Sequence, residues 1–125
     1  MSAVIFARGY NIAGQIEKCR AYAESRGYSV AGVIVCQGSE LPSVIGGMGE
    51  GIDRVSVYDM ARISRNSFEQ YAILAELELD YGVTIESATS QDRNELEERL
   101  MTNIIKAVRD HDRREMTKLR SRLEL

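Results

Sequence analysis

Four short apolar segments recur along the first ninety residues of this 125-residue chain, and a longer segment separates each from the next. They are rich in β-branched and aromatic residues: AVIFA (3–7), YSVAGVIV (28–35), IDRVSVYD (52–59) and VTIESAT (83–89). Segments of this length and composition predict β-strands. Because parallel strands need long crossover connections, usually helices, the sequence predicts an α/β fold. We expect a mainly parallel sheet of four to five strands flanked by helices.

Two of the connecting segments carry helical patterns. Apolar residues recur at helical spacing in residues 12–27 and in residues 66–82, and a glycine ends each segment. Asn66 and Ser67 are both candidate N-caps for the second helix. Residues 36–51 instead hold the single proline and five of the ten glycines, so we expect a loop there with at most a short helix.

The last third of the chain has a different pattern. Residues 92–123 lack glycine and proline, and apolar residues follow one another every four positions at Leu96, Leu100, Ile104 and Val108. A helix of roughly thirty residues is longer than most globular helices, so its far end is expected to extend beyond the domain. The simplest way to bury its apolar stripe is to pair it with the same helix of a second copy, which predicts a homodimer or higher oligomer. The alternative is a shorter helix followed by a frayed tail.

Length and composition fit one domain over residues 1–125, with an α/β core over 1–90 and the long helix over 91–125. There are two cysteines and no apolar run long enough to cross a membrane. These features predict a cytoplasmic protein that makes no membrane contact. No third and fourth ligand accompany the cysteines at usable spacing, so no metal site is expected.

Charge is unevenly distributed along the chain. The formal net charge is −3, yet the final twenty residues hold seven Lys and Arg against four Asp and Glu. The basic positions that could contact a polyanion are Arg113, Arg114, Lys118, Arg120 and Arg122. The same residues could instead form the solvated face of an amphipathic helix.

The segment FARGYNIAGQ (6–15) joins the first predicted strand to the first predicted helix. Loops at the carboxyl ends of parallel strands face the usual ligand crevice of α/β proteins. This junction therefore presents a cation, Arg8, and a phenol, Tyr10, where a ligand would be expected.

These segments together resemble the catalytic domain of serine recombinases, the group of resolvases, invertases and large serine integrases. The resemblance runs from FAR through QIEKCRAYAESRGY to IDRVSVYDMARISRNSFE and LELDYGVTIESATS, and it covers essentially the whole chain. Its most specific part is ARISRN, which is similar to the family's Asp-Arg-Leu-Ser-Arg-Asn. The final helix with DRREM is similar to the family's dimerisation helix. The resemblance implies a resolvase-like fold and a role in site-specific DNA recombination or integration, with DNA and no small molecule as the substrate.

The family's chemistry implies roles for particular residues here. A serine hydroxyl attacks a DNA phosphodiester and forms a phosphoserine link, so neither a metal nor another cofactor is implied. Arg8, Arg62 and Arg65 fall on the family's arginine positions, where guanidinium groups stabilise charge on the phosphoryl oxygens. Arg62 and Arg65 are three residues apart and could approach the same anion from one helical turn. Alternatively these arginines hold the loops together, with carboxylates such as Asp59 as partners.

The chain departs from the family pattern at three functional positions. Tyr10 stands where the nucleophilic serine is expected, Ala61 replaces the aspartate before Arg62, and no arginine precedes Pro42. Family members normally continue into a separate DNA-binding domain, and none is expected within this chain. The sequence therefore predicts a pseudoenzyme that does not cleave DNA and acts as a DNA-binding or recombinase-binding partner.

Two alternatives stay open. Tyr10 could act as an unorthodox nucleophile in an active recombinase, because neighbouring arginines would stabilise a phenolate; otherwise it packs over the emptied pocket or donates a hydrogen bond to a loop carbonyl. The chain could also be an unrelated flavodoxin-like regulatory module. Receiver-type modules have acidic residues at the ends of their strands. Ala7 and Cys36, at the ends of the first two predicted strands, are not acidic.

Overall fold

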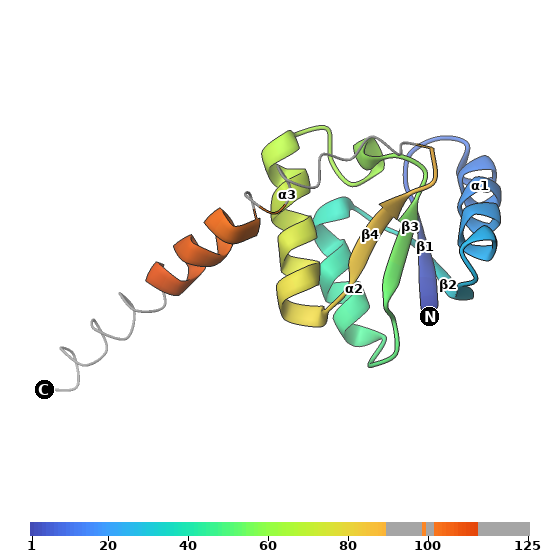
Figure 1. The fold of residues 1–125 in the computed structure, drawn as a ribbon. Coiled ribbons are helices and arrows are strands. Elements are labelled where there is room, and N and C mark those ends of the chain that lie inside the picture. Colours follow the sequence, from blue (N-terminus) through green and yellow to red (C-terminus); the bar gives the residue numbers. More distant parts are fainter. Residues whose placement is uncertain (90–98, 100–101, 113–125) are drawn as a thin grey trace, which may run out of the picture.

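A computed structural model of the protein describes residues 1–89, 99 and 102–112. Its strands are β1 (Ser2–Ala7), β2 (Ser29–Val35), β3 (Arg54–Val57) and β4 (Thr84–Ser87). They form one sheet in the order β2-β1-β3-β4, and every neighbouring pair is parallel (Figure 1). The predicted α/β fold with a parallel sheet is confirmed, with four strands. All four carboxyl ends consequently lie at one edge of the sheet.

Helices cover both faces of the sheet. The α-helices of this part are α1 (Ile12–Ser25), α2 (Leu41–Gly47) and α3 (Ser67–Glu76). Shorter turns are η1 (Gly38–Glu40), η2 (Met60–Arg62) and a π-helical turn, η3 (Leu77–Tyr81). Helix α1 lies on one face, and α2 and α3 lie together on the other (Figure 1).

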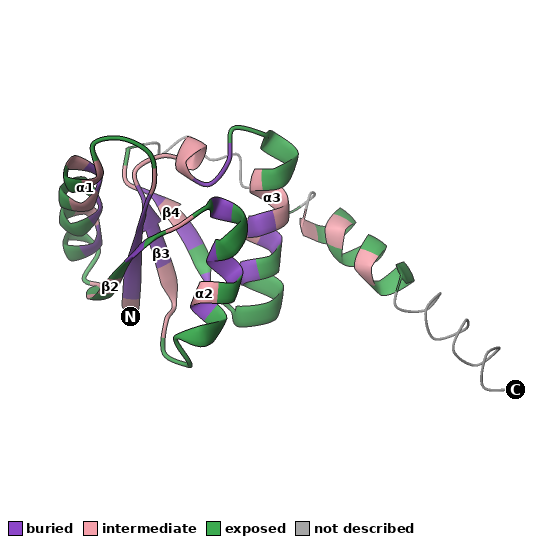
Figure 2. Ribbon diagram, turned by 180° about the vertical axis from the view of Figure 1, so that it is seen from behind, coloured by how far each residue is buried: buried purple, intermediate pink, exposed green. Residues whose placement is uncertain are grey.

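The central strand β1 separates two apolar layers. Figure 2 shows that β1 is largely buried. Val4 and Phe6 of this strand are fully buried and belong to the main core with residues of α2 and α3. Ile5 is paired with Ser56, whose hydroxyl donates to the backbone oxygen of Cys19 in α1 (3.4 Å). Cys19 is fully buried and forms part of the core. Burial raises the pKa of its thiol to about 11, so the thiol stays protonated at neutral pH.

The connection between β2 and β3 contains more helix than its glycines suggest. Leu41 and Ile45 of α2 are buried in the main core, and this burial stabilises a helix of low intrinsic propensity. Pro42 lies in the first turn, where its missing N–H is not needed. The expected short helix is present as α2, but η1 and α2 together make most of the predicted loop helical. The third strand is shorter than the predicted 52–59, because the chain turns away into η2 after Tyr58.

A helix over residues 102–112 lies within the predicted long helix and extends away from the sheet (Figure 1). Arg109 donates from Nη2 to both carboxylate oxygens of Asp80 in η3 (2.8 and 3.0 Å). The rest of the predicted helix, at residues 92–98, 100–101 and 113–123, lies outside the described residues, and so do Leu96 and Leu100 of the predicted apolar stripe. Among the helices that the structure does describe, none is long and apolar enough to cross a membrane.

Candidate functional site

A hollow of about 460 Å³ opens at the carboxyl edge of the sheet. The loops after β1, β2 and β3 line it through residues 8–10, 37–39 and 62–65, and Glu69 of α3 completes the lining. The connection after β1 leads to α1 on one face of the sheet, whereas the connections after β2 and β3 lead to α2 and α3 on the other face. The neighbouring strands β1 and β3 therefore send their connections to opposite faces, and a crevice opens between these connections. The family resemblance had marked this second loop as a functional position only through the missing arginine before Pro42, and the structure adds residues 37–39 to the lining of the hollow.

Two glycines allow the loops to approach closely. A Cβ on Gly38 would lie 1.8 Å from the backbone oxygen of Ile63, so only glycine fits between the second and third loops. Gly9 has φ +93°, and a Cβ there would lie 2.9 Å from Nη1 of Arg62. The first loop therefore also requires glycine at its contact with Arg62.

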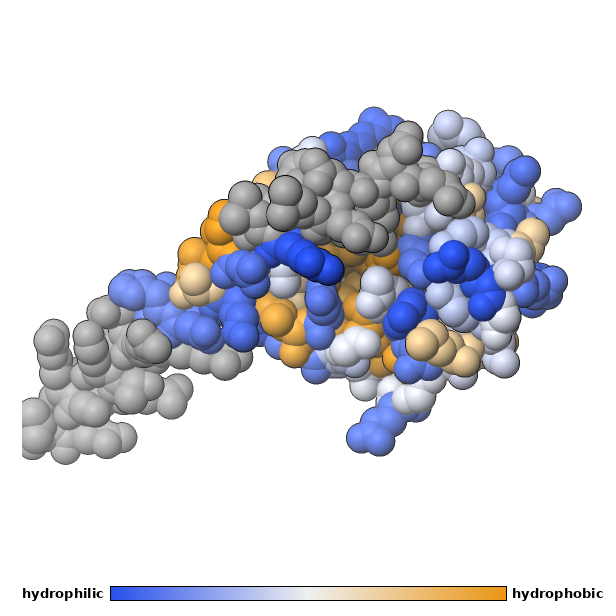
Figure 3. All heavy atoms as spheres, in the orientation of Figure 1, coloured by the Kyte–Doolittle hydropathy of each residue, from blue (hydrophilic) through white to orange (hydrophobic). Residues whose placement is uncertain are grey.

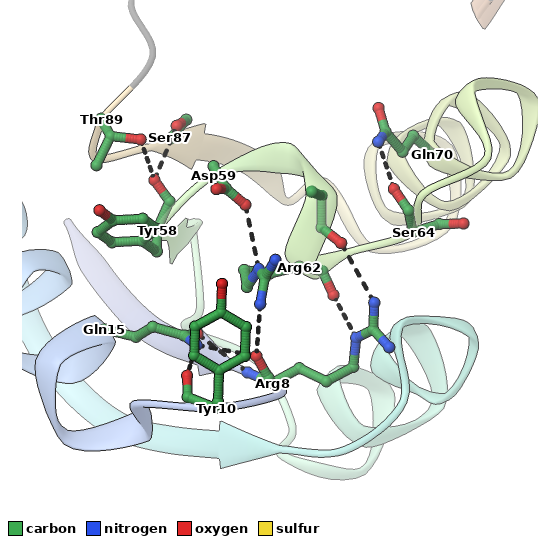
Figure 4. A network of polar contacts seen from close by, with 11 residues as sticks. Arg8, Tyr10, Gln15, Tyr58, Asp59, Arg62, Ser64, Gln70, Ser87 and Thr89 are labelled. Atoms are coloured by element: carbon green, nitrogen blue, oxygen red, sulfur yellow. Dashed lines mark hydrogen bonds and ion pairs between the residues drawn. The ribbon is translucent and has the colours of Figure 1, made fainter.

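Arg8 and Arg62 join the first and third loops by reciprocal hydrogen bonds (Figure 4). Arg8 donates from Nε to the backbone oxygen of Arg62 (2.7 Å) and from Nη2 to that of Ala61 (3.2 Å). Arg62 donates from Nη1 to the backbone oxygen of Arg8 (3.3 Å). Its Nε also forms an ion pair with Oδ1 of Asp59 (3.2 Å), the carboxylate expected as a partner. Both guanidiniums therefore use some of their N–H donors to hold the two loops together.

Gln15 fixes the backbone of the first loop from within α1. Its side-chain nitrogen donates to the backbone oxygens of Arg8 (2.9 Å) and Tyr10 (2.8 Å), and its side-chain oxygen accepts from the backbone N–H of Arg8 (3.1 Å). The residue is only 5% exposed, so these bonds are shielded from competing water. This buried amide therefore sets the direction in which the side chains of Arg8 and Tyr10 leave the backbone.

The Tyr10 ring lies at the mouth of the hollow. The residue is 80% exposed, and the guanidinium carbon of Arg62 lies 5.7 Å from the ring centroid, a cation–π arrangement (Figure 4). The ring therefore packs against Arg62 and does not fill the space beneath it.

Arg65 reaches the hollow from the segment that precedes α3. Ser64, in the same segment, donates its hydroxyl to Oε2 of Glu69 (2.9 Å) and accepts from the backbone N–H of Asn66 (3.1 Å). The side chain of Gln70 donates to the backbone oxygen of Ser64. This network fixes the backbone on either side of Arg65, while Arg65 itself is exposed.

The structure brings together four of the residues singled out in the sequence. Arg8, Tyr10, Arg62 and Arg65 all line the same hollow, although they come from two loops more than fifty residues apart. Three guanidiniums face two carboxylates, those of Asp59 and Glu69, which leaves the site cationic and suited to an anion. The five basic positions from Arg113 to Arg122 lie outside the described residues. Within the described part of the chain, no group of three or more His, Cys, Asp or Glu could hold a metal ion.

Comparisons with known proteins identify the family. Residues 6–124 match the sequence profile of the resolvase N-terminal domain. The fold is similar to that of the N-terminal catalytic domain of TP901-1 integrase, with a TM-score of 0.65 and 20% identity over 88% of this chain and 98% of the other. It is also similar to the C-terminal catalytic domain of ISC1926 TnpA, an IS607-like serine recombinase, with a TM-score of 0.56 and 27% identity over 80% of this chain and 78% of the other.

No curated protein sequence matched the chain. The profile match nevertheless spans nearly all of it, and both structural matches share its fold. The chain therefore belongs to the resolvase N-terminal domain family and is a resolvase-like serine recombinase domain, linked to site-specific recombination.

Proposed function

We propose that this domain takes part in site-specific DNA recombination without cleaving DNA, by binding DNA or an active recombinase. The observation that carries the proposal is the Tyr10 ring, which is 80% exposed and packed against Arg62. The family resemblance implies that Tyr10 stands where the nucleophilic serine is expected. A phenol oxygen lies several ångströms further from the backbone than a serine hydroxyl. In-line attack on phosphorus tolerates little displacement of the nucleophile.

The arginines support a binding role at the same hollow. Arg8 and Arg62 donate to backbone oxygens and to Asp59, yet each guanidinium carries five N–H groups and keeps donors for a phosphate. Arg65 is exposed at the rim. Contacts of this kind position a protein on the DNA backbone without reading sequence. The basic residues after the described helix, Arg113, Arg114, Lys118, Arg120 and Arg122, would extend the backbone contact.

Residues 91–125 are proposed as the dimerisation helix beside an α/β core over residues 1–90. Ile104 and Val108 lie one helical turn apart and are 46% and 55% exposed. Hydrophobic residues also show on this side of the molecule, over the helix of residues 102–112 and beside α3 (Figure 3). Apolar residues on one stripe of a helix that extends from the domain support pairing with a second copy, or with the equivalent helix of a recombinase.

A test for covalent attachment separates a binding protein from a cleaving one. The full chain is incubated with a pool of random-sequence DNA duplexes, denatured, and examined for protein linked to DNA. We expect no adduct, while an active serine recombinase on its own site gives one as the positive control. An adduct that forms with the natural chain and disappears in Tyr10→Phe would establish Tyr10 as a nucleophile and overturn the proposal.

A further inference from the structure

We infer that the hollow at the sheet edge binds an unpaired nucleotide of single-stranded DNA, with the base stacked on the free face of Tyr10 and the phosphate held by Arg65. The inference rests on the proposed role in DNA binding and names the form of DNA that this site takes.

Tyr10 is arranged as a stacking platform. Its backbone is held by the Gln15 side chain (2.8 Å), and its ring is held by the Arg62 guanidinium at 5.7 Å. Arg62 is fixed in turn by the Asp59 carboxylate (3.2 Å). An aromatic side chain that is 80% exposed and held at both ends offers a base a surface that is already ordered before binding.

The phosphate half of the site lies on the same hollow. Arg65 is exposed at its rim and follows Ser64 directly. The Ser64 hydroxyl is hydrogen-bonded to Asn66 and Glu69, and the Ser64 backbone oxygen accepts from Gln70. The volume of about 460 Å³ falls within the range of small-ligand sites. Glu69 also lines the hollow, but its carboxylate accepts the Ser64 hydroxyl, which partly satisfies the charge.

Geometry favours a single strand over a duplex. Bases in a duplex are stacked on their neighbours, so no base face is available to a protein ring unless the duplex opens. An aromatic platform beside cationic groups is the combination that binds single-stranded nucleic acid. The projecting ring of Tyr10, beside Arg62 and Arg65, supplies that combination at this hollow.

The test measures binding of a fluorescent oligothymidylate to the full chain by anisotropy. We expect Tyr10→Ala to weaken binding about tenfold or more, because one base loses its stacking partner. Tyr10→Phe should bind like the natural chain, since the ring is retained. Phe68→Ala is the matched control, because Phe68 is an aromatic residue that is 65% exposed and does not line the hollow.

The phosphate contact is tested by salt dependence. Arg65→Gln should weaken binding and reduce the slope of log affinity against log salt by about 0.7. Arg20→Gln removes the same charge from an exposed position on α1 outside the hollow and should change the slope less. Because Tyr10 and Arg65 are both exposed, unfolding curves of the variants should match that of the natural chain.

Three results would overturn the inference. They are equal binding by Tyr10→Ala and the natural chain, tighter binding of a duplex than of the oligothymidylate, and equally tight binding of thymidine monophosphate. The last would identify a free nucleotide as the ligand. None of them produces or removes a covalent adduct, so they leave the proposal of a non-cleaving DNA-binding domain to its own test.

Discussion

Gly38 controls how closely two of the three loops around the hollow approach one another. A Cβ added at residue 38 would lie 1.8 Å from the backbone oxygen of Ile63. Ile63 lies between Arg62 and Ser64 in the third loop. Any side chain at residue 38 would push that loop away from the second one. The placement of the arginines thus depends on a residue that carries no functional group.

Gly38→Ala is therefore expected to lower the free energy of unfolding by about 1–3 kcal/mol, because backbone must move to admit one methyl group. Urea unfolding followed by circular dichroism measures the change. Gly47→Ala is the control, since nothing lies within 4 Å of a Cβ at that helical position. The control should leave stability unchanged or raise it by up to about 1 kcal/mol. Equal losses in both variants would contradict the account of the loop contact.

At the scale of the elements, α3 influences the site directly, because its N-cap residue Asn66 follows Arg65 in the chain. Asn66 is the N-cap: its side-chain oxygen accepts from the backbone N–H of Glu69 (3.0 Å). The carboxylate of Glu69 then binds the Ser64 hydroxyl (2.9 Å). The cap and the network around Ser64 form one hydrogen-bonded unit, so the start of the helix and the position of Arg65 are linked.

Asn66→Ala should cost about 1 kcal/mol of stability, because the helix loses its capping acceptor. Asn66→Asp keeps an oxygen at that place and should retain most of the stability. Ser67→Ala distinguishes the two N-cap candidates of the sequence and is expected to stay within about 0.5 kcal/mol of the natural chain. Thermal and urea unfolding of the three variants provide the measurement. A larger loss of stability for Ser67→Ala than for Asn66→Ala would show that Ser67, and not Asn66, caps the helix.

At the scale of the whole molecule, the strand order β2-β1-β3-β4 decides what meets at the hollow. Crossovers to opposite sides of β1 bring residues 8–10, 37–39 and 62–65 to one end of the sheet. The helix over residues 102–112 lies apart from this edge and is joined to η3 by Arg109 and Asp80. Nucleotide contact and association with a second copy are therefore assigned to separate surfaces.

The proposed dimer predicts that Ile104→Glu combined with Val108→Glu converts the protein to a monomer in sedimentation velocity. Both positions are exposed in the single chain, so folding should be retained while a buried carboxylate would disrupt a helix pair. Lys106→Glu introduces a carboxylate on the opposite side of the same helix and should remain dimeric. A natural chain that sediments as a monomer at every concentration would refute the proposal.

Local sequence patterns were sufficient to predict the type of each main element. The strand segments, the N-cap and glycine stop around residues 66–82 and the helical character of residues 12–27 all follow from spacing and short-range chemistry. The expected resolvase-like family is confirmed by the profile match. The sequence was less informative where tertiary burial stabilises a weak element, as Leu41 and Ile45 do for α2.

The sequence by itself determined which residue types were available: the guanidiniums of Arg8, Arg62 and Arg65 and the phenol of Tyr10. Only the tertiary structure decided how they are used. Arg8 and Arg62 exchange hydrogen bonds across 54 residues, Gln15 orients the first loop, and Gly38 lets the second loop join the site. The physical reason is that contacts between loops depend on how strands are ordered in the sheet, and no local periodicity in the chain encodes that order.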